Sequence, residues 1–331
     1  MRVYVCEYVT GGGCLTEALP ASLVREGELM LRALVRDLSD IDGIEVVVSR
    51  DARLPDPGLA CEVIRLEPSA DAWAQWRRAI ARADATWPIA PETGGALERL
   101  SRLVLDTQRA LLGSTPASVA VAASKRATAA RLAQCGIAVV PTYPVAQAPL
   151  GQAPFWVVKP DDGAGAEDTR LYARDALAAA LADGAIPSGH VAQPYLEGTA
   201  ASLSLICRDG RAWLLTANRQ RIACEDGAFR LQGVVVNGLA RERARFEPLA
   251  RAVAAAFPGL WGYVGIDAIC TPEAIRVLEI NPRLTTSYAG LRAALGVNPA
   301  ALVLALAHAD PRVPTAARPP VDVDVELGCA A

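Results

Sequence analysis

The order of predicted secondary-structure elements changes along this 331-residue chain, and that change restricts its fold most. Up to about residue 112, apolar segments of strand length alternate with amphipathic segments of helical period. The strand-like segments are 2–9, 44–50, 61–66 and 86–91, and the helical segments are 21–38, 71–84 and 96–108. Strands separated by helices predict a parallel sheet, so we expect an α/β domain over residues 1–112.

Beyond residue 188, strand-like segments follow one another, which predicts an antiparallel sheet in a lobe of residues 188–331. These segments are 190–198, 201–207, 211–220, 229–238, 261–270 and 275–283. We expect a helix near 246–257, two helices within 286–308 and a proline-rich surface tail over 311–320. Between the two sheets, residues 113–187 are expected to form a small lobe. Its predicted elements are a helix over 123–136, strands over 137–145 and 155–160, and a helix over 174–184.

Composition excludes several classes of function. The net charge is −3 and no basic run occurs, so we expect no nucleic-acid partner. The longest apolar runs, such as 301–307, are too short to span a bilayer, and the first strand does not have the pattern of a signal peptide. Eight scattered cysteines fit reduced thiols in a cytoplasm. Only two histidines occur, which argues against a histidine-ligated metal or a Ser-His-Asp triad.

Lysine is rare in this chain: of 33 basic residues, only Lys125 and Lys159 are lysines. An ammonium is a compact point charge that fits a phosphate oxygen in a narrow site better than the wide guanidinium fork does. Lys159 ends an apolar strand and precedes Gly163 and Gly165, an arrangement that predicts a phosphate-binding loop. An ordinary hairpin turn is the alternative. Lys125 lies early in a helix, where an exposed surface lysine is the alternative.

A second group of polar residues lies on the last predicted hairpin. Glu279 and Asn281 are two residues apart on one strand, so their side chains share a face. If residues 271–275 form the loop, Asp267 lies opposite Glu279, and Arg283 follows just beyond. Oxygen ligands without histidine or cysteine suit Mg²⁺, so this pattern predicts a magnesium site. A solvated sheet face is the alternative.

The segment 192–198 is a strand that ends in a turn, where main-chain groups could meet a purine edge. Taken in order, Lys125, Lys159 with its glycine loop, "QPYLEG", Asp267 and "EINPR" resemble the ATP-grasp superfamily. The resemblance covers most of the chain. It implies an α/β and α+β protein, with the ATP-grasp fold preceded by an N-terminal parallel-sheet α/β (pre-ATP-grasp) domain.

The resemblance also implies roles for individual residues. Both lysines would contact the phosphates of ATP, and Lys159 and Arg283 would act in catalysis, with Arg283 facing the transferred phosphate. Mg²⁺, or Mn²⁺ in its place, would be held by Asp267, Glu279 and Asn281. The nucleotide would further contact Gly163, Gly165, Gln193 and the main chain of Pro194, Tyr195 and Leu196. Ala200 stands where several relatives place a ribose-binding Glu, so Glu197 is the candidate substitute.

More narrowly, "EYVTGGG", "APETGG", "KPDDGAG" and "TANRQ" resemble a group of ATP-grasp ligases that includes tyramine–glutamate ligases of methanofuran biosynthesis. This implies an ADP-forming carboxylate–amine ligase that works through an acyl phosphate on two small-molecule substrates, glutamate and an aromatic amine such as tyramine. Its assembly as a homodimer stays open. The substrate-binding residues that this reading implies are Glu7, Thr10, Gly11, Gly12, Asn218 and Arg219.

Three alternatives stay open at this point. The "TGGG" segment could be merely a tight turn, with Glu7 as a helix-capping or surface acid. The chain could be a nucleotide-binding regulatory module without turnover, although its set of site residues is intact. It could also be a dinucleotide-dependent oxidoreductase, but Gly11 and Gly13 are followed by Thr16, so that fingerprint is incomplete.

Overall fold

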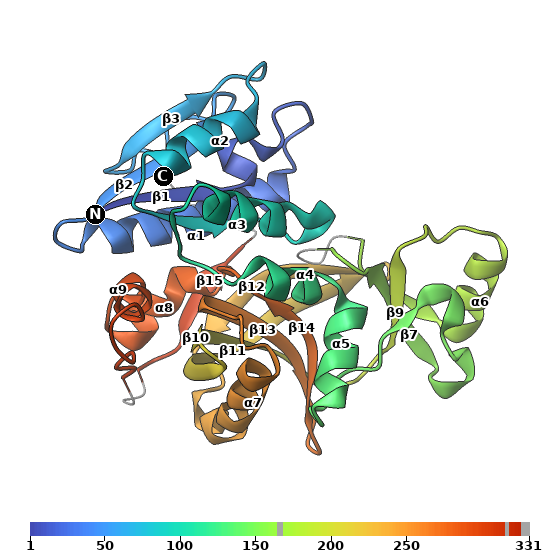
Figure 1. Cartoon of the computed structure of the whole chain (residues 1–331). Helices are drawn as coiled ribbons and strands as arrows, with labels where there is room; N and C mark the ends of the chain where they lie inside the picture. The colour runs from blue at the N-terminus through green and yellow to red at the C-terminus, as the bar shows by residue number, and fades with distance from the viewer. Residues whose placement is uncertain (164–167, 315–317, 326–331) are drawn as a thin grey trace.

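The computed structural model describes residues 1–163, 168–314 and 318–325, and Figure 1 shows a parallel sheet above an extended antiparallel sheet. The parallel sheet has the strand order β3-β2-β1-β4-β5. Its strands are β1 (Arg2–Glu7), β2 (Glu45–Asp51), β3 (Glu62–Leu66), β4 (Ala85–Ile89) and β5 (Ala110–Leu111). The expectation of a parallel sheet in the first third of the chain is confirmed.

Helices cover both faces of the parallel sheet because successive side chains of β1 point to opposite faces. Val3 and Val5 pack in one core with Leu34 of α1 (Ala21–Ser39). Tyr4 and its neighbours on the other face pack against Trp76. The second face is covered by α2 (Ala72–Ala81) and α3 (Ala96–Asp106).

The second sheet is antiparallel throughout its described pairings and has the order β14-β13-β10-β11-β12-β8-β7-β9-β6, with β15 added beside β12. Its strands are β6 (Tyr143–Pro144), β7 (Phe155–Pro160), β8 (Arg170–Ala173), β9 (His190–Pro194), β10 (Thr199–Arg208), β11 (Arg211–Glu225), β12 (Ala228–Val236), β13 (Gly262–Cys270), β14 (Ile275–Asn281) and β15 (Val321–Asp324). The predicted antiparallel sheet is therefore confirmed.

The remaining helices pack around the second sheet and between the two sheets (Figure 1). They are α4 (Pro116–Ala123), α5 (Lys125–Gln134), α6 (Arg174–Ala182), α7 (Arg243–Ala256), α8 (Tyr288–Leu295) and α9 (Pro299–Ala305). Tyr288 and Leu291 of α8 share one core with Leu34 of α1, and the amide of Asn298 donates to the carbonyl of Asp37 over 2.6 Å. The N-terminal domain is thus anchored to the C-terminal half by a continuous apolar core.

Three local expectations differ from the structure. The strand expected over 137–145 is reduced to β6, because Val139 instead forms an isolated bridge with Val277. The helix expected over 123–136 begins at Lys125, because the side chain of Ser124 caps it by accepting from the amide of Ala127. The proline-rich segment was not expected to lead into a strand, yet β15 follows it and pairs with β12.

The pairing of β9 bears on where the small lobe ends. β9 pairs with β6 and β7, which lie in the segment expected to form that lobe. A boundary at residues 187 and 188 would separate β9 from these partners. We therefore propose that the small lobe extends to the end of β9.

Among the described residues, no single helix is long and apolar enough to cross a membrane. Only α8 and α9 together pass that test of length and composition, and they are bent by 93° relative to each other.

Candidate active site

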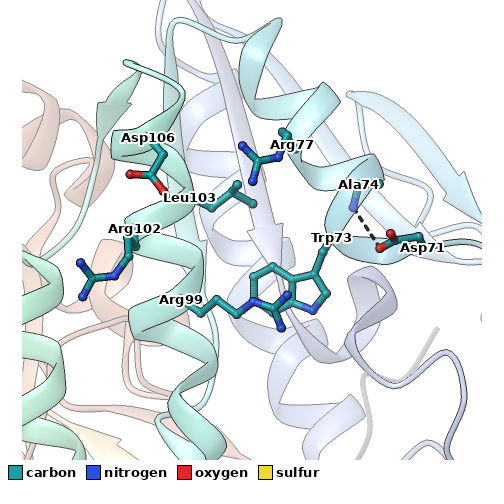
Figure 2. A pocket seen from close by; sticks show the side chains of 8 residues that line it. All are labelled: Asp71, Trp73, Ala74, Arg77, Arg99, Arg102, Leu103 and Asp106. Carbon is teal, nitrogen blue, oxygen red and sulfur yellow. Dashed lines mark hydrogen bonds between the residues drawn. The ribbon is translucent and has the colours of Figure 1, made fainter.

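A hollow of about 350 Å³ lies between α2 and α3 on the outside of the N-terminal domain (Figure 2). It is lined by Arg77, Arg99 and Arg102, and the guanidinium of Arg99 lies 3.7 Å from the ring centroid of Trp73. All three arginines are exposed, and Arg102 pairs with Glu98. None of the residues predicted to bind ATP or metal lines this hollow.

A larger cavity of about 630 Å³ lies between the two halves of the second sheet and reaches α1. It brings together most of the residues that the sequence predicted for the site. Those lining it are Lys159, Gln193, Pro194, Tyr195, Leu196, Arg219, Asp267, Glu279, Asn281 and Arg283. Residues from β7, β9, β11, β13 and β14 therefore face one space, although the strands are far apart in sequence.

The predicted carboxylate pair is formed by the β13–β14 hairpin. Asp267 is the register partner of Glu279, as expected from the loop length. The Asp267 carboxylate accepts hydrogen bonds from the side-chain amides of Gln220 over 3.0 Å and Asn281 over 3.1 Å. Burial and the neighbouring Glu279 charge raise the pKa of Asp267 to about 8. Burial acts the same way on Glu279, but Lys125 and Lys159 outweigh it and lower the pKa of Glu279.

Both lysines lie beside this pair. Lys159, at the end of β7, is 8% exposed, and the Nζ of Lys125 lies 3.4 Å from the Oε2 of Glu279. Burial, assisted by Lys125, lowers the pKa of Lys159 against the opposing effect of the two carboxylates. Two ammonium groups and two carboxylates thus meet in one buried cluster, an arrangement suited to phosphate and a divalent cation.

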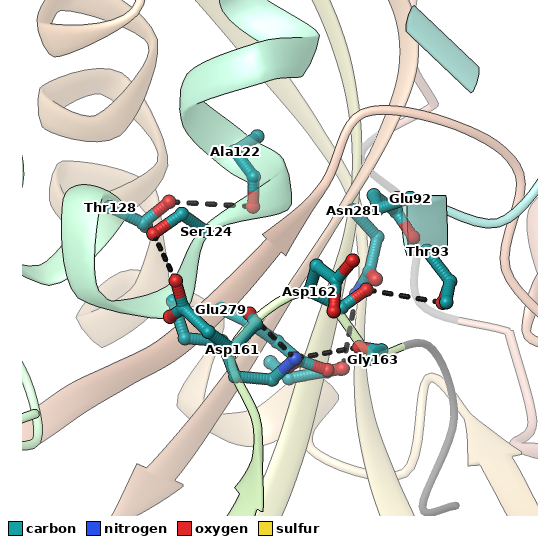
Figure 3. A network of polar contacts seen from close by, with 12 residues as sticks. Glu92, Thr93, Ala122, Ser124, Thr128, Asp161, Asp162, Gly163, Glu279 and Asn281 are labelled. Atoms are coloured by element: carbon teal, nitrogen blue, oxygen red, sulfur yellow. Dashed lines mark hydrogen bonds and ion pairs between the residues drawn. The ribbon is translucent and has the colours of Figure 1, made fainter. Parts of the chain in front are cut away.

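Asp161 and Asp162, the first two acids after Lys159, lie beside Ser124 and Thr93 (Figure 3). The carboxylate of Asp161 accepts from the Ser124 hydroxyl over 2.6 Å and from the Arg126 amide over 2.9 Å, at the start of α5. The carboxylate of Asp162 accepts from the amide of Gly94 over 3.0 Å. These acids are therefore bound by N–H and O–H donors, and neither lines the cavity.

Lys125 is fixed by the same loop. Its Nζ donates to the carbonyl of Gly163 over 2.6 Å, and its backbone amide donates to the carbonyl of Asp161 over 3.1 Å. These bonds hold the ammonium at the loop, and its Nζ lies 3.4 Å from the Oε2 of Glu279. The other glycine predicted to cradle phosphate, Gly165, lies outside the described residues.

Sequence reasoning missed Glu92, which binds the predicted catalytic arginine. The Arg283 guanidinium donates to both carboxylate oxygens of Glu92, with distances of 2.8–3.1 Å. The two side chains are 11% and 6% exposed. Burial alone would lower the pKa of Arg283, but the Glu92 carboxylate raises it. The signal was present in "APETGG", which was noted as a motif without a role for its glutamate.

The predicted adenine-binding segment lines the cavity, but not all of its backbone N–H groups already have a hydrogen-bond acceptor. Tyr195 N–H donates to the carbonyl of Phe155 over 3.0 Å, whereas Leu196 N–H has no acceptor among the described residues. The rings of Tyr195 and Phe229 stack at 6.5 Å beside this segment. Leu196 is therefore the residue whose amide could reach a purine. Glu197 is exposed and does not line the cavity, so the structure does not place it as a ribose ligand.

The N-terminal "TGGG" segment forms a turn that is closed on itself. The buried carboxylate of Glu7 accepts from the amide and hydroxyl of Thr10, both over 2.6 Å, and the carbonyl of Gly11 accepts from the Trp76 indole over 3.0 Å. Gly12 has φ 106°, a conformation that favours glycine. Neither Glu7, Thr10, Gly11 nor Gly12 lines the cavity. We therefore propose that Glu7 has the capping role that the sequence left open.

Asn218 has internal partners instead of a place in the cavity. Its amide donates to the hydroxyls of Ser202 and Ser204 over 3.3 and 3.2 Å, and its carbonyl accepts from the amide of Asn237. Ser204 is joined through the Tyr263 hydroxyl to Thr285, within the loop that follows β14. Asn218 thus stabilises that loop indirectly. Its neighbour Arg219 does line the cavity and is exposed.

The residues present fit Mg²⁺ and a nucleotide. Among the described residues, no cluster of three or more His, Cys, Asp or Glu side chains is arranged to hold a metal. Mg²⁺ does not need such a cage, because it usually takes one or two carboxylates and completes its shell with water and substrate phosphates. Asp267 and Glu279, with the amide oxygen of Asn281, match that requirement.

Comparisons with known proteins agree with this geometry. A model described as an ATP-grasp domain matches residues 122–287, which is 166 of the 331 residues, and a pre-ATP-grasp 3 domain model matches residues 44–119. The chain therefore belongs to the ATP-grasp family. Its fold is the ATP-grasp fold with a pre-ATP-grasp domain.

Individual relatives are distant. A curated protein from Methanocaldococcus fervens, named tyramine–L-glutamate ligase, is 25% identical over 291 residues, which is 86% of this chain and 88% of that one. A solved ATP-grasp superfamily protein from Archaeoglobus fulgidus has a TM-score of 0.73 and 24% identity over 98% of this chain and 99% of that chain. An L-amino acid ligase from Bacillus licheniformis has a TM-score of 0.67 and 16% identity, covering 92% and 73%.

The metal site can be tested by titration. We expect Glu279→Gln and Asn281→Ala each to raise the Mg²⁺ concentration for half-maximal activity by about tenfold, because each removes an oxygen ligand while the sheet is kept. ADP release measured against Mg²⁺ concentration checks this, with Glu273→Gln in the exposed hairpin turn as the control. Unchanged titration curves in both variants would mean that Glu279 and Asn281 belong to a solvated sheet face and do not bind Mg²⁺.

Proposed function

We propose that this protein is an ATP- and Mg²⁺-dependent carboxylate–amine ligase that releases ADP and phosphate. One observation carries the proposal. Lys125 and Lys159 meet the Asp267–Glu279 pair beside the cavity whose other wall is the Tyr195–Leu196 segment. Phosphates, a divalent cation and a purine each have a matching surface there.

The residues support phosphoryl transfer followed by acyl transfer. A substrate carboxylate oxygen forms a bond to the γ-phosphorus of ATP, and the bond to the β-phosphate oxygen breaks with release of ADP. The amine then forms a bond to the acyl carbon, and inorganic phosphate leaves. When bound, Mg²⁺ would neutralise phosphate charge. Lys125, Lys159 and Arg283 would hold and neutralise the transferred group, while the cavity walls exclude water.

The finer part of the proposal concerns substrates: glutamate as the acid and an aromatic amine such as tyramine as the nucleophile. It is supported by the name of the relative that aligns with most of the chain. Arg219 at the cavity also supports it, because no hydrogen bond or ion pair of its side chain occurs within the described residues, so it could bind a substrate carboxylate.

Identifying the reaction product tests the proposed substrates. With ATP, Mg²⁺, glutamate and tyramine, we expect equimolar ADP and a γ-glutamyl amide of tyramine, detected by mass. ADP release with another amine, but none with tyramine or related aryl-ethylamines, would contradict the aromatic-amine substrate. The ligase function itself would still stand. ATP binding without ADP release over a panel of acids and amines would favour a regulatory module.

A further inference from the structure

Helix α1 of the N-terminal domain contributes to the lining of the cavity. Glu26 and Met30, one helical turn apart, both line it. Residues so spaced share one face of a helix, so this face of α1 supplies one acidic and one apolar group to a space otherwise built by the second sheet. None of the residues assigned above to ATP or Mg²⁺ comes from α1.

The charges around the cavity distinguish Glu26 from the other acids. Within the described part of the chain, the carboxylates that line the cavity are Glu26, Asp267 and Glu279. The latter two face each other on the β13–β14 hairpin and lie with the lysines. The charge of Glu26, like those of Glu92 and Glu279, raises the pKa of the Arg283 guanidinium against the effect of burial. Glu26 thus adds a carboxylate from α1 to the cavity, on a different element from the β13–β14 hairpin.

The part of the cavity wall that includes Met30 is apolar. Met30 belongs to a core that includes Val234, with Leu231 packed against it, and all three line the cavity. A thioether beside branched aliphatic groups accommodates an aromatic or aliphatic body. A carboxylate next to such a surface matches a molecule that has an ammonium at one end and an apolar group at the other.

We infer that Glu26 binds the ammonium group of the amine substrate, while Met30, Leu231 and Val234 bind its apolar body. This rests on the proposed ligase function and assigns the amine to the α1 end of the cavity. The substrate class that follows is a primary amine on an aryl or alkyl group. A diamine or amino acid as nucleophile would place a second charge against the apolar surface, which is costly.

Two nucleophiles separate amine binding from the first chemical step. Hydroxylamine is uncharged at neutral pH and traps an acyl phosphate as a hydroxamate. Glu26→Gln should raise the KM for tyramine by about 10-fold to 100-fold, the equivalent of one lost charge-assisted hydrogen bond. Hydroxamate formation from glutamate and ATP should stay within about twofold of wild type. Glu17→Gln, at an exposed position outside the cavity, is the matched control.

Equilibrium binding tests the same inference without turnover. Glu26→Gln should weaken binding of tyramine, but not of 4-(2-hydroxyethyl)phenol, which carries a neutral hydroxyl in place of the ammonium. Met30→Ala should weaken both ligands. An unchanged KM and affinity for tyramine in Glu26→Gln, or an equal loss for both ligands, would overturn the assignment. A wild-type protein that binds tyramine through Glu26 but forms no hydroxamate would instead overturn the proposed reaction.

Discussion

Replacing Lys159 by arginine is expected to lower kcat by about 10²-fold although the charge is kept. Lys159 is 8% exposed, and its pKa is affected by the charges of Asp267 and Glu279, which line the same cavity. A guanidinium is wider and planar, so it cannot occupy this position without displacing its neighbours or the phosphate. The measurement is ADP release under saturating ATP and Mg²⁺, together with the melting temperature to separate activity from folding.

Arg126→Lys is the matched control for this prediction. Arg126 is exposed and follows Lys125 on α5, and its backbone amide, not its side chain, holds Asp161. The exchange should leave kcat within about twofold because exposed substitutions rarely matter. A Lys159→Arg variant with the activity of the control would place Lys159 outside the phosphate site.

The second large effect is expected from Glu92→Gln. This change removes the charge that balances Arg283, in a pair that is nearly buried on both sides. Breaking a buried ion pair from one side costs about 3–5 kcal/mol of unfolding free energy; because Arg283 also borders the cavity, we expect about 2–3 kcal/mol here. We also expect a loss of kcat, because the guanidinium is no longer held in one position. Urea unfolding and ADP release measure the two effects.

Glu98→Gln provides the comparison for Glu92→Gln. Glu98 forms an i,i+4 pair with Arg102 on the outside of the same domain, and such surface pairs contribute about 0.3–0.5 kcal/mol. If Glu92→Gln were as mild as Glu98→Gln in both stability and kcat, the contact between Glu92 and Arg283 would not fix the arginine.

The sequence predicted best what depends on local periodicity. The alternation of strands and helices predicted the parallel sheet, and the loop length between 270 and 275 predicted that Asp267 faces Glu279. The second contact lies within one hairpin, and the first follows from the order of elements along the chain. Side-chain alternation along a strand then fixes which residues share a face.

Contacts between distant segments could not be predicted in this way. Glu92 and Arg283 lie in different domains, and nothing in the spacing of either motif links them. The sequence also does not show that Asp161 accepts from the Arg126 amide at the start of α5, or that Asp162 accepts from the Gly94 amide. For Glu7, the sequence left a substrate role and a capping role open, and in the structure its carboxylate accepts from the amide and hydroxyl of Thr10. For Glu92, Asp161 and Asp162, the partner lies far away along the chain.

The turn Glu92–Gly95 has a consequence for how such a protein can be recombined. It binds Arg283 through Glu92 and the loop after Lys159 through Thr93 and Gly94, with Gly94 at φ 61° so that its amide reaches Asp162. In a chimera whose first domain comes from a homologue, the homologue's turn would have to fit two separate segments of this chain. These are the segment around Arg283 and the loop after Lys159. By contrast, residues of α1 could diverge without breaking those bonds. Nucleophile preference would then evolve by point substitutions on one helix, and wholesale domain exchange would more often yield inactive hybrids.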